Sequence, residues 1–193
     1  MLKRGGPEFS RCPHPAGSII MVSGAMGRAS DWDRQLPLAE RYNLLRFPIS
    51  GNAERDSGEL LAACRERGIV SPHLLGHSLG SLACLEFCDA TSRPDALALR
   101  PKTLALVCPV SMPRGSPADR VLLFFEEEGA ARDLPAAVRS SLSSDATIML
   151  VRSHYPFRDS PVRFNVVYSE FIGEGNRMRP DDNAKNGGAK GKF

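Results

Sequence analysis

Short apolar runs, separated by polar segments that contain glycine or proline, recur along the first 110 residues. The runs are 18–23 (SIIMVS), 42–47 (YNLLRF), 72–76 (PHLLG) and 103–108 (TLALVC). Apolar runs of this length, bounded by Gly or Pro, are typical of buried strands. The sequence therefore predicts four strands in this part of the chain.

The segments between these runs have helical character. We expect one helix to begin near Ser30. A second should follow the capping-box spacing of Asp56 and Glu59 and stop at Gly68, and a third should contain SLACLEFC. Strands that alternate with helices form mainly parallel sheets with helices on both faces. The predicted fold class is therefore α/β.

The pattern is less regular after Pro109. We expect helical structure over 118–142, broken near Pro135, and a strand at 146–151 (ATIMLV). The segment 163–171 (RFNVVYSEF) alternates enough to predict a strand, although its pattern also fits a helix.

Length and composition predict a single globular domain over residues 18–172 of the 193-residue chain. From residue 173 onward the chain is almost without apolar residues, which predicts a disordered tail over 173–193. Residues 1–17 are basic, rich in Gly and Pro, and have no apolar core of a signal peptide, so we expect a disordered leader. A transit peptide for an organelle is the weaker interpretation of that segment.

Charge and cysteine content narrow the function classes. The net charge of +3 comes from the two ends of the chain, so the central part is near neutral and we expect no nucleic-acid partner. No apolar run reaches the length of a membrane span. The five cysteines form no C-x-x-C pair, which predicts free thiols in a reducing compartment, the cytoplasm, with no structural metal site and no cofactor.

The clearest motif is GHSLG at 76–80, which has the form G-x-S-x-G around Ser78. A predicted strand precedes it and a predicted helix follows it, as a nucleophile elbow requires. Gly76 and Gly80 suit such a turn because a Cβ at either position would crowd it. The pattern makes Ser78 a candidate nucleophile.

Residues 18–110 resemble the first half of an α/β-hydrolase domain. The resemblance rests on SIIMVSGAMGRASDWD, LAERYNLLRFPISGNAERDSG, VSPHLLGHSLGSLACLEF and LRPKTLALVCPV, in that order. It implies an α/β-hydrolase-like, mainly parallel sheet with Ser78 as nucleophile. An oxyanion hole would then form from the backbone N–H of Leu79 and that of Ala25 or Met26. The chain departs from the family where Ser23-Gly24 replaces His-Gly.

The base and the acid are less well defined. Of the four histidines only His154 follows Ser78, as the family's Ser–acid–His order demands. In one interpretation a compact enzyme uses His154 as base, with Asp145 or else Asp159 as acid. In the other, 146–151 resembles the family's seventh strand, the C-terminal strands are incomplete, and the triad is unfinished. The lack of any histidine after His154 favours the second.

The predicted function is acyl hydrolysis of a small ester, thioester or amide through an acyl-enzyme on Ser78, impaired if the triad is incomplete. The alternative is an inactive hydrolase-like protein that binds a ligand or partner. Residues 111–145 occupy the place of a lid or cap. Their apolar run 121–125 is interpreted either as a helix packed on the sheet or as a lid for a lipophilic substrate.

Overall fold

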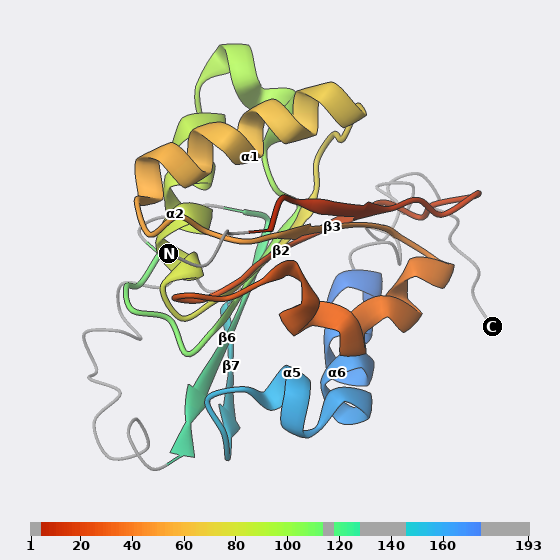
Figure 1. Cartoon of the computed structure of the whole chain (residues 1–193), viewed down its shortest axis with the longest axis vertical. Helices are drawn as coiled ribbons and strands as arrows, with labels where there is room; N and C mark the ends of the chain where they lie inside the picture. The colour runs from red at the N-terminus through yellow and green to blue at the C-terminus, as the bar shows by residue number, and fades with distance from the viewer. Residues whose placement is uncertain (1–4, 114–117, 128–145, 175–193) are drawn as a thin grey trace, which may run out of the picture.

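The computed structural model describes residues 5–113, 118–127 and 146–174 of the chain (Figure 1). In this described part seven strands form one sheet in the order β1-β3-β2-β4-β5-β6-β7. All neighbours are parallel except β1 and β3, which are antiparallel. The strands are β1 (Glu8–Ser10), β2 (Ser18–Val22), β3 (Asn43–Phe47), β4 (His73–His77), β5 (Thr103–Val107), β6 (Arg120–Glu126) and β7 (Ala146–Val151).

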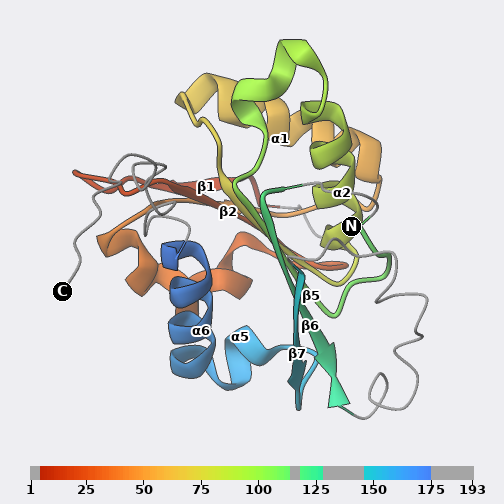
Figure 2. The ribbon, with the colours of Figure 1, turned by 180° about the vertical axis from the view of Figure 1, so that it is seen from behind.

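Helices cover both faces of this sheet (Figures 1 and 2). One face carries α1 (Ala53–Arg67) and α2 (Gly80–Thr91), and the other carries η1 (Ala29–Glu40), α5 (Pro156–Asp159) and α6 (Pro161–Glu174). A short 3-10 helix, η2 (Pro94–Leu99), follows α2. The strands predicted from the first 110 residues and at 146–151 are all confirmed, as is the α/β class.

Helix α1 shows which local signals were interpreted correctly. Gly68 ends the helix in a left-handed conformation with φ of 64°, as predicted. The N-cap, however, is Asn52 rather than Asp56. The buried Asp56 carboxylate lies inside the helix and accepts hydrogen bonds from the N–H groups of Ser50 (2.7 Å) and Gly51 (3.1 Å). It therefore holds the loop before the helix.

Strand β6 corrects the largest error of the sequence-based prediction. The run 121–125, expected to be helical, is a strand that pairs with both β5 and β7. Its first four residues are buried in the sheet, so this part of 111–145 is not a lid. Residues 114–117 and 128–145 lie outside the described part. The sheet therefore contains a strand between β5 and β7 where the sequence predicts a helix.

Helix α6 corrects the strand predicted at 163–171. The buried residues of this segment are spaced so that they lie on one face of a helix; they are Phe164, Tyr168, Phe171 and Ile172. They pack in the same cluster as Trp32 of η1. The helix continues to Glu174, so the first two residues of the predicted disordered tail are helical, and residues 175–193 lie outside the described part.

The N-terminal segment is not a disordered leader between residues 8 and 12. Strand β1 pairs Glu8 with Arg46 of β3. The Arg46 guanidinium also bonds to the Glu8 carboxylate at 2.5 Å and to the Asp33 carboxylate of η1. Cys12 is buried, and its N–H donates to Asn43 Oδ1 at 3.0 Å. These contacts join the segment to the edge of the sheet.

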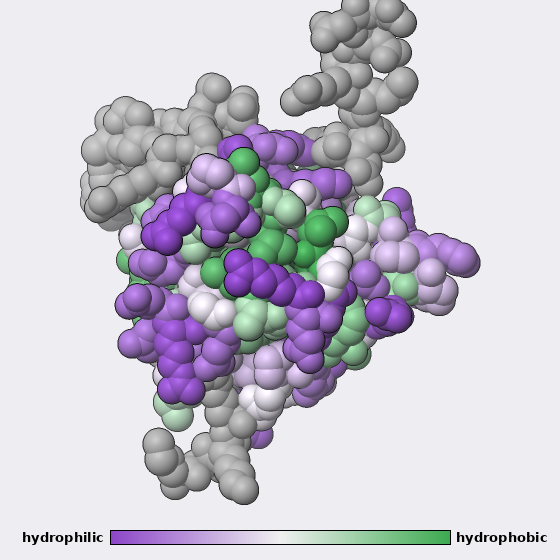
Figure 3. Space-filling view, turned by 90° about the horizontal axis from the view of Figure 1, so that it is seen from above, coloured by the Kyte–Doolittle hydropathy of each residue, from purple (hydrophilic) through white to green (hydrophobic). Residues whose placement is uncertain are grey.

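Apolar residues also reach the surface. Figure 3 shows them gathered near the centre of the face covered by α1 and η2, surrounded by polar residues. Val70 and Leu97 are exposed apolar residues in the loop after α1 and in η2, at 64% and 50%. Across the described residues, every helix is too short or too polar to cross a membrane.

Candidate active site

Ser78 occupies a sharp turn between β4 and α2. Its φ is 48°, in the left-handed region that residues other than glycine rarely adopt. Its N–H donates to Val107 O at 2.8 Å, which fixes the turn against the end of β5. Strained conformations of this kind persist where the surrounding structure determines them, and they are common at functional sites.

Glycines allow the turn to lie against its neighbours. A Cβ on Gly80 would lie 2.3 Å from Ser23 O and 2.8 Å from Val22 O, both backbone atoms. A Cβ on Gly76 would lie 2.7 Å from Cys84 Sγ. The start of α2 therefore contacts the end of β2 backbone against backbone.

The loop after β2 lies beside Ser78. A Cβ on Gly24 would come within 3.2 Å of Ser78 Cβ, so the loop backbone is in close contact with the turn. Ala25 and Met26 follow on the surface, and Met26 has a φ of 55°. The two segments predicted to supply oxyanion donors are therefore adjacent.

Leu79 lies at the start of α2. The first internal hydrogen bonds of the turn run from the N–H of Ser81 to Ser78 O (2.9 Å) and from the N–H of Leu82 to Leu79 O (3.2 Å). The N–H of Leu79 precedes these bonds, and the first N–H groups of a helix have no partner inside it. Such groups, with the positive end of the helix dipole, are suited to bind an anion.

Three side chains meet near the carboxyl ends of the next strands. Cys108 follows β5, Glu126 ends β6, and His154 lies three residues after β7. The Nδ1 atom of His154 is 3.7 Å from Glu126 Oε1, and both side chains are about two-fifths exposed. One donor atom from each of the three residues lies within 4.8 Å of the others.

The structure brings His154 to the turn through His77. The Nε2 of His77 lies 3.0 Å from His154 O, and the ring centroids are 4.8 Å apart. Because a carbonyl only accepts, His77 Nε2–H is the donor. Within the described residues no hydrogen bond joins Ser78 Oγ to His154. The side chain of His77 holds the loop that carries His154.

His77 is neutral at neutral pH. Burial and, to a smaller extent, the charge of His154 lower its pKa to about 4, against an opposing effect of the hydrogen bond to His154 O. A neutral ring between the turn and the His154 loop adds no positive charge beside Ser78.

Cys108 also has an unusual backbone, with φ of 47°, and its N–H donates to Phe124 O at 2.8 Å. Burial raises the pKa of its thiol to about 11, and the Glu126 carboxylate acts in the same direction, while a backbone hydrogen bond from Glu126 opposes both. The thiol is therefore protonated at neutral pH and is not an activated nucleophile.

The acids named from the sequence do not contact His154 in the described part. The Asp159 carboxylate is exposed and accepts a hydrogen bond from Ser153 Oγ, and Asp145 lies outside the described residues. The carboxylate beside His154 is Glu126, which sequence reasoning missed. A signal was present, because Glu126 directly follows the apolar run 121–125, but that run was interpreted as a helix.

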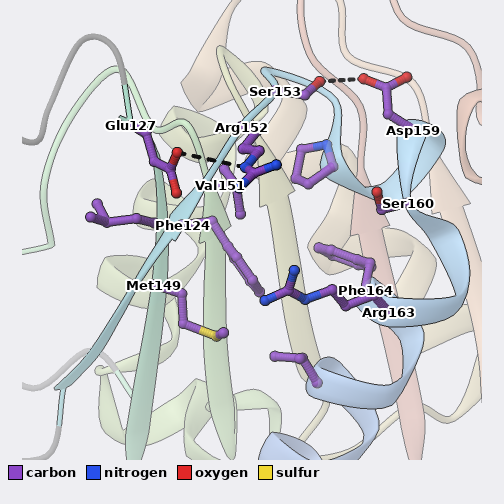
Figure 4. Close-up of a pocket in the computed structure, with 13 residues that line it drawn as sticks. Phe124, Glu127, Met149, Val151, Arg152, Ser153, Asp159, Ser160, Arg163 and Phe164 are labelled. Carbon is purple, nitrogen blue, oxygen red and sulfur yellow. Dashed lines mark hydrogen bonds and ion pairs between the residues drawn. The ribbon is translucent and has the colours of Figure 1, made fainter.

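A separate hollow of about 220 Å³ lies between β7 and helices α5 and α6 (Figure 4). Its rim holds two interactions, between Arg152 and Glu127 at 3.8 Å and between Ser153 and Asp159. The residues around it are Phe124, Glu127, Met149, Leu150, Val151, Arg152, Ser153, Pro156, Asp159, Ser160, Arg163, Phe164 and Val167. Ser78 and His154 are not among them, so the hollow lies beside the site.

Solved structures share this architecture. An esterase from Thermogutta terrifontis has a TM-score of 0.69 at 11% identity, over 88% of this chain and 93% of that one. MenH from S. aureus has a TM-score of 0.70 at 10% identity, over 89% and 99%. The type II thioesterase BorB from the borrelidin biosynthetic cluster has a TM-score of 0.68 at 13% identity, over 87% and 96%.

These likenesses establish the α/β-hydrolase fold for the chain. The identities are too low to carry an activity from one protein to another. No protein-family model matches the sequence, and no curated protein matches it.

The contact at Gly80 predicts a loss of stability on substitution. Gly80→Ala should lower the free energy of unfolding by about 1–3 kcal/mol, because the added Cβ meets backbone atoms that cannot rotate away. Gly58→Ala in α1 is the matched control, because no atom lies within 4 Å of its added Cβ. The control should gain about 0.5–1 kcal/mol. Urea unfolding measures the free energy of unfolding of both variants, and equal changes in the two would contradict the close contact at Gly80.

The lowered pKa of His77 predicts a pH dependence of stability. The unfolded chain binds a proton at His77 near pH 6.5, whereas the folded chain binds it only near pH 4. Stability from this residue is therefore complete above pH 6.5 and falls as the pH drops toward 4, by roughly 3 kcal/mol.

The non-titrating variant His77→Gln, whose amide can still donate to His154 O, should lose less stability over this pH range. Urea unfolding at several pH values gives the free energy of unfolding of both proteins. The carboxylates titrate in both proteins, so their effect drops out of the difference between the two free energies. Parallel pH profiles would show that His77 is not buried as a neutral ring.

Proposed function

We propose that the chain is a serine hydrolase in which Ser78 is the nucleophile, His154 the base and Glu126 the acid. The observation that carries the proposal is the 3.7 Å approach of Glu126 Oε1, at the end of β6, to His154 Nδ1, in the loop after the neighbouring strand β7. The chain order Ser78, Glu126, His154 is the Ser–acid–His order of α/β-hydrolases. This assignment replaces Asp145 and Asp159 as the acid and needs no residue beyond His154.

Each group has a defined part in the reaction. His154 Nε2 takes the proton as Ser78 Oγ attacks the substrate carbonyl, and Glu126 stabilises the imidazolium that forms. His154 then gives the proton to the leaving group as the acyl-enzyme forms. Water, deprotonated by His154, attacks the acyl-enzyme and releases the acid and Ser78.

The oxyanion formed in each attack needs donors, and the N–H groups of Leu79 and of Ala25 or Met26 are proposed for this role. Donors of this kind typically lower the barrier by about 2.7–4 kcal/mol each. The contact between Gly24 and Ser78 supports the proposal, because it holds the second donor segment against the turn.

The proposed substrates are small esters or thioesters, with amides as a further class. The fold neighbours include an esterase, a type II thioesterase and an N-acyl homoserine lactonase.

The second candidate function is an inactive hydrolase-like protein that binds a ligand. It is favoured by one observation, the lack of a hydrogen bond between Ser78 Oγ and His154 among the described residues. Catalytic hydrogen bonds are often long without substrate, so the serine hydrolase remains our proposal.

A fluorophosphonate probe and a chromogenic short-chain ester test the proposal. The probe should label Ser78, located by mass spectrometry of the peptide, and Ser78→Ala should abolish both labelling and hydrolysis. Glu126→Gln should lower kcat by about 10²–10⁴, because the amide no longer stabilises the imidazolium.

Asp159→Asn is the matched control, because it also neutralises a carboxylate on the segment around His154. We expect its kcat within about twofold of the unchanged protein, since Asp159 bonds to Ser153. A large loss at Asp159 with none at Glu126 would reverse the assignment of the acid. Binding of an ester without labelling or turnover would support the inactive protein.

A further inference from the structure

Cys108, Glu126 and His154 form a cluster with chemistry beyond proton transfer. A thiol, a carboxylate and an imidazole offer donor atoms that all lie within 4.8 Å of one another. We propose that these three side chains bind Zn²⁺ reversibly and that the bound ion inhibits hydrolysis. The inhibition rests on the proposed roles of Glu126 and His154, whereas the binding of the ion does not.

The donor set selects the metal. Zn²⁺ binds sulfur, nitrogen and oxygen ligands, while Mg²⁺ and Ca²⁺ require oxygen. Two of the three ligands here are a thiolate and an imidazole, and this set therefore favours Zn²⁺ over the more abundant divalent cations.

The geometry requires only small movements. Tetrahedral Zn²⁺ at ordinary bond lengths holds its ligand atoms roughly 3.3–3.6 Å apart. The Nδ1–Oε1 distance between His154 and Glu126 is already 3.7 Å. Both side chains are about two-fifths exposed and can rotate, while Cys108 is held by its backbone bond to Phe124 O. Three protein ligands leave a fourth position for water.

Binding of Zn²⁺ releases one proton from the protein. The Zn–S bond forms as the Cys108 thiol loses its proton to solvent, and no electron is transferred. The ion takes the carboxylate of Glu126 and a ring nitrogen of His154, so the two groups no longer act on each other. His154 is then unable to take the proton of Ser78, and hydrolysis stops until the ion leaves. Cys108 has no part in hydrolysis itself.

Cobalt tests the site directly, because Co²⁺ replaces Zn²⁺ and its bond to a thiolate gives a near-ultraviolet charge-transfer band. The unchanged protein should show this band with Co²⁺, and Zn²⁺ should remove it by displacement. Cys108→Ser should lose the band. Cys12→Ser, whose hydroxyl can replace the thiol that donates to Glu40 O, should keep it.

Hydrolysis tests the consequence. Zn²⁺ should inhibit the unchanged protein, with recovery on adding a chelator, and Cys108→Ser should need at least about 10-fold more Zn²⁺. The inhibition of each protein is measured relative to its own rate of hydrolysis without Zn²⁺. Mg²⁺ and Ca²⁺ at the same concentrations should have no effect.

A third measurement needs no variant. Zn²⁺ should protect Cys108 of the unchanged protein from alkylation by iodoacetamide, as located by mass spectrometry. Absence of both the cobalt band and this protection overturns the metal site, even if the protein is an active hydrolase. Zn²⁺ binding with unchanged or faster hydrolysis overturns the inhibition. A cobalt band in a protein without any hydrolysis supports the site and contradicts the proposed function.

Discussion

The contact between the start of α2 and the end of β2 is the constraint on which the site depends. At Gly24 an added Cβ would meet the side chains of His77 and Ser78, whereas at Gly80 it would meet Ser23 O of the backbone. Backbone atoms meet here, so no side-chain rearrangement can substitute for the fit. The contact sets the position of Ser78, of the loop with Ala25 and Met26, and of His77, which in turn holds the His154 loop. The arrangement of two strands and one helix thus determines four parts of the site.

Local sequence signals predicted most of the fold where strands alternate with helices. Three of the predicted strands are short and fully or almost fully buried, namely Ser18–Val22, Asn43–Phe47 and Thr103–Val107. Such apolar runs are easily recognised between polar segments. The same signal failed at Arg120–Glu126, because five apolar residues followed by acids suit a helix as well as a central strand. Only the pairing with β5 and β7 shows that this segment is a strand and not a helix. Pairing between separate segments of the chain is not visible in a local pattern.

The interpretation of 121–125 as a helix also limited the prediction of the site. The segment around Ser78 was predicted with its glycines, because the motif is local. Glu126 could not be recognised as a carboxylate at a strand end while its strand was interpreted as a helix, so Asp145 and Asp159 were named instead. His154 was found by elimination, yet its neighbours Cys108 and Glu126 lie at the ends of two other strands, β5 and β6. The cluster exists only because the carboxyl ends of parallel strands meet at one edge of the sheet.

The short strand β1 has a consequence for the sheet as a whole. It pairs with β3 at the edge of the sheet, and its Glu8 lies against the largely buried Arg46. An exposed edge strand offers unpaired N–H and C=O groups to other chains. Removing residues 1–17 as if they were a dispensable leader would uncover β3 and separate Arg46 from one of its two carboxylates. The shortened protein would then carry an open edge suited to pairing with its own copies, and it would aggregate for a reason unrelated to its active site.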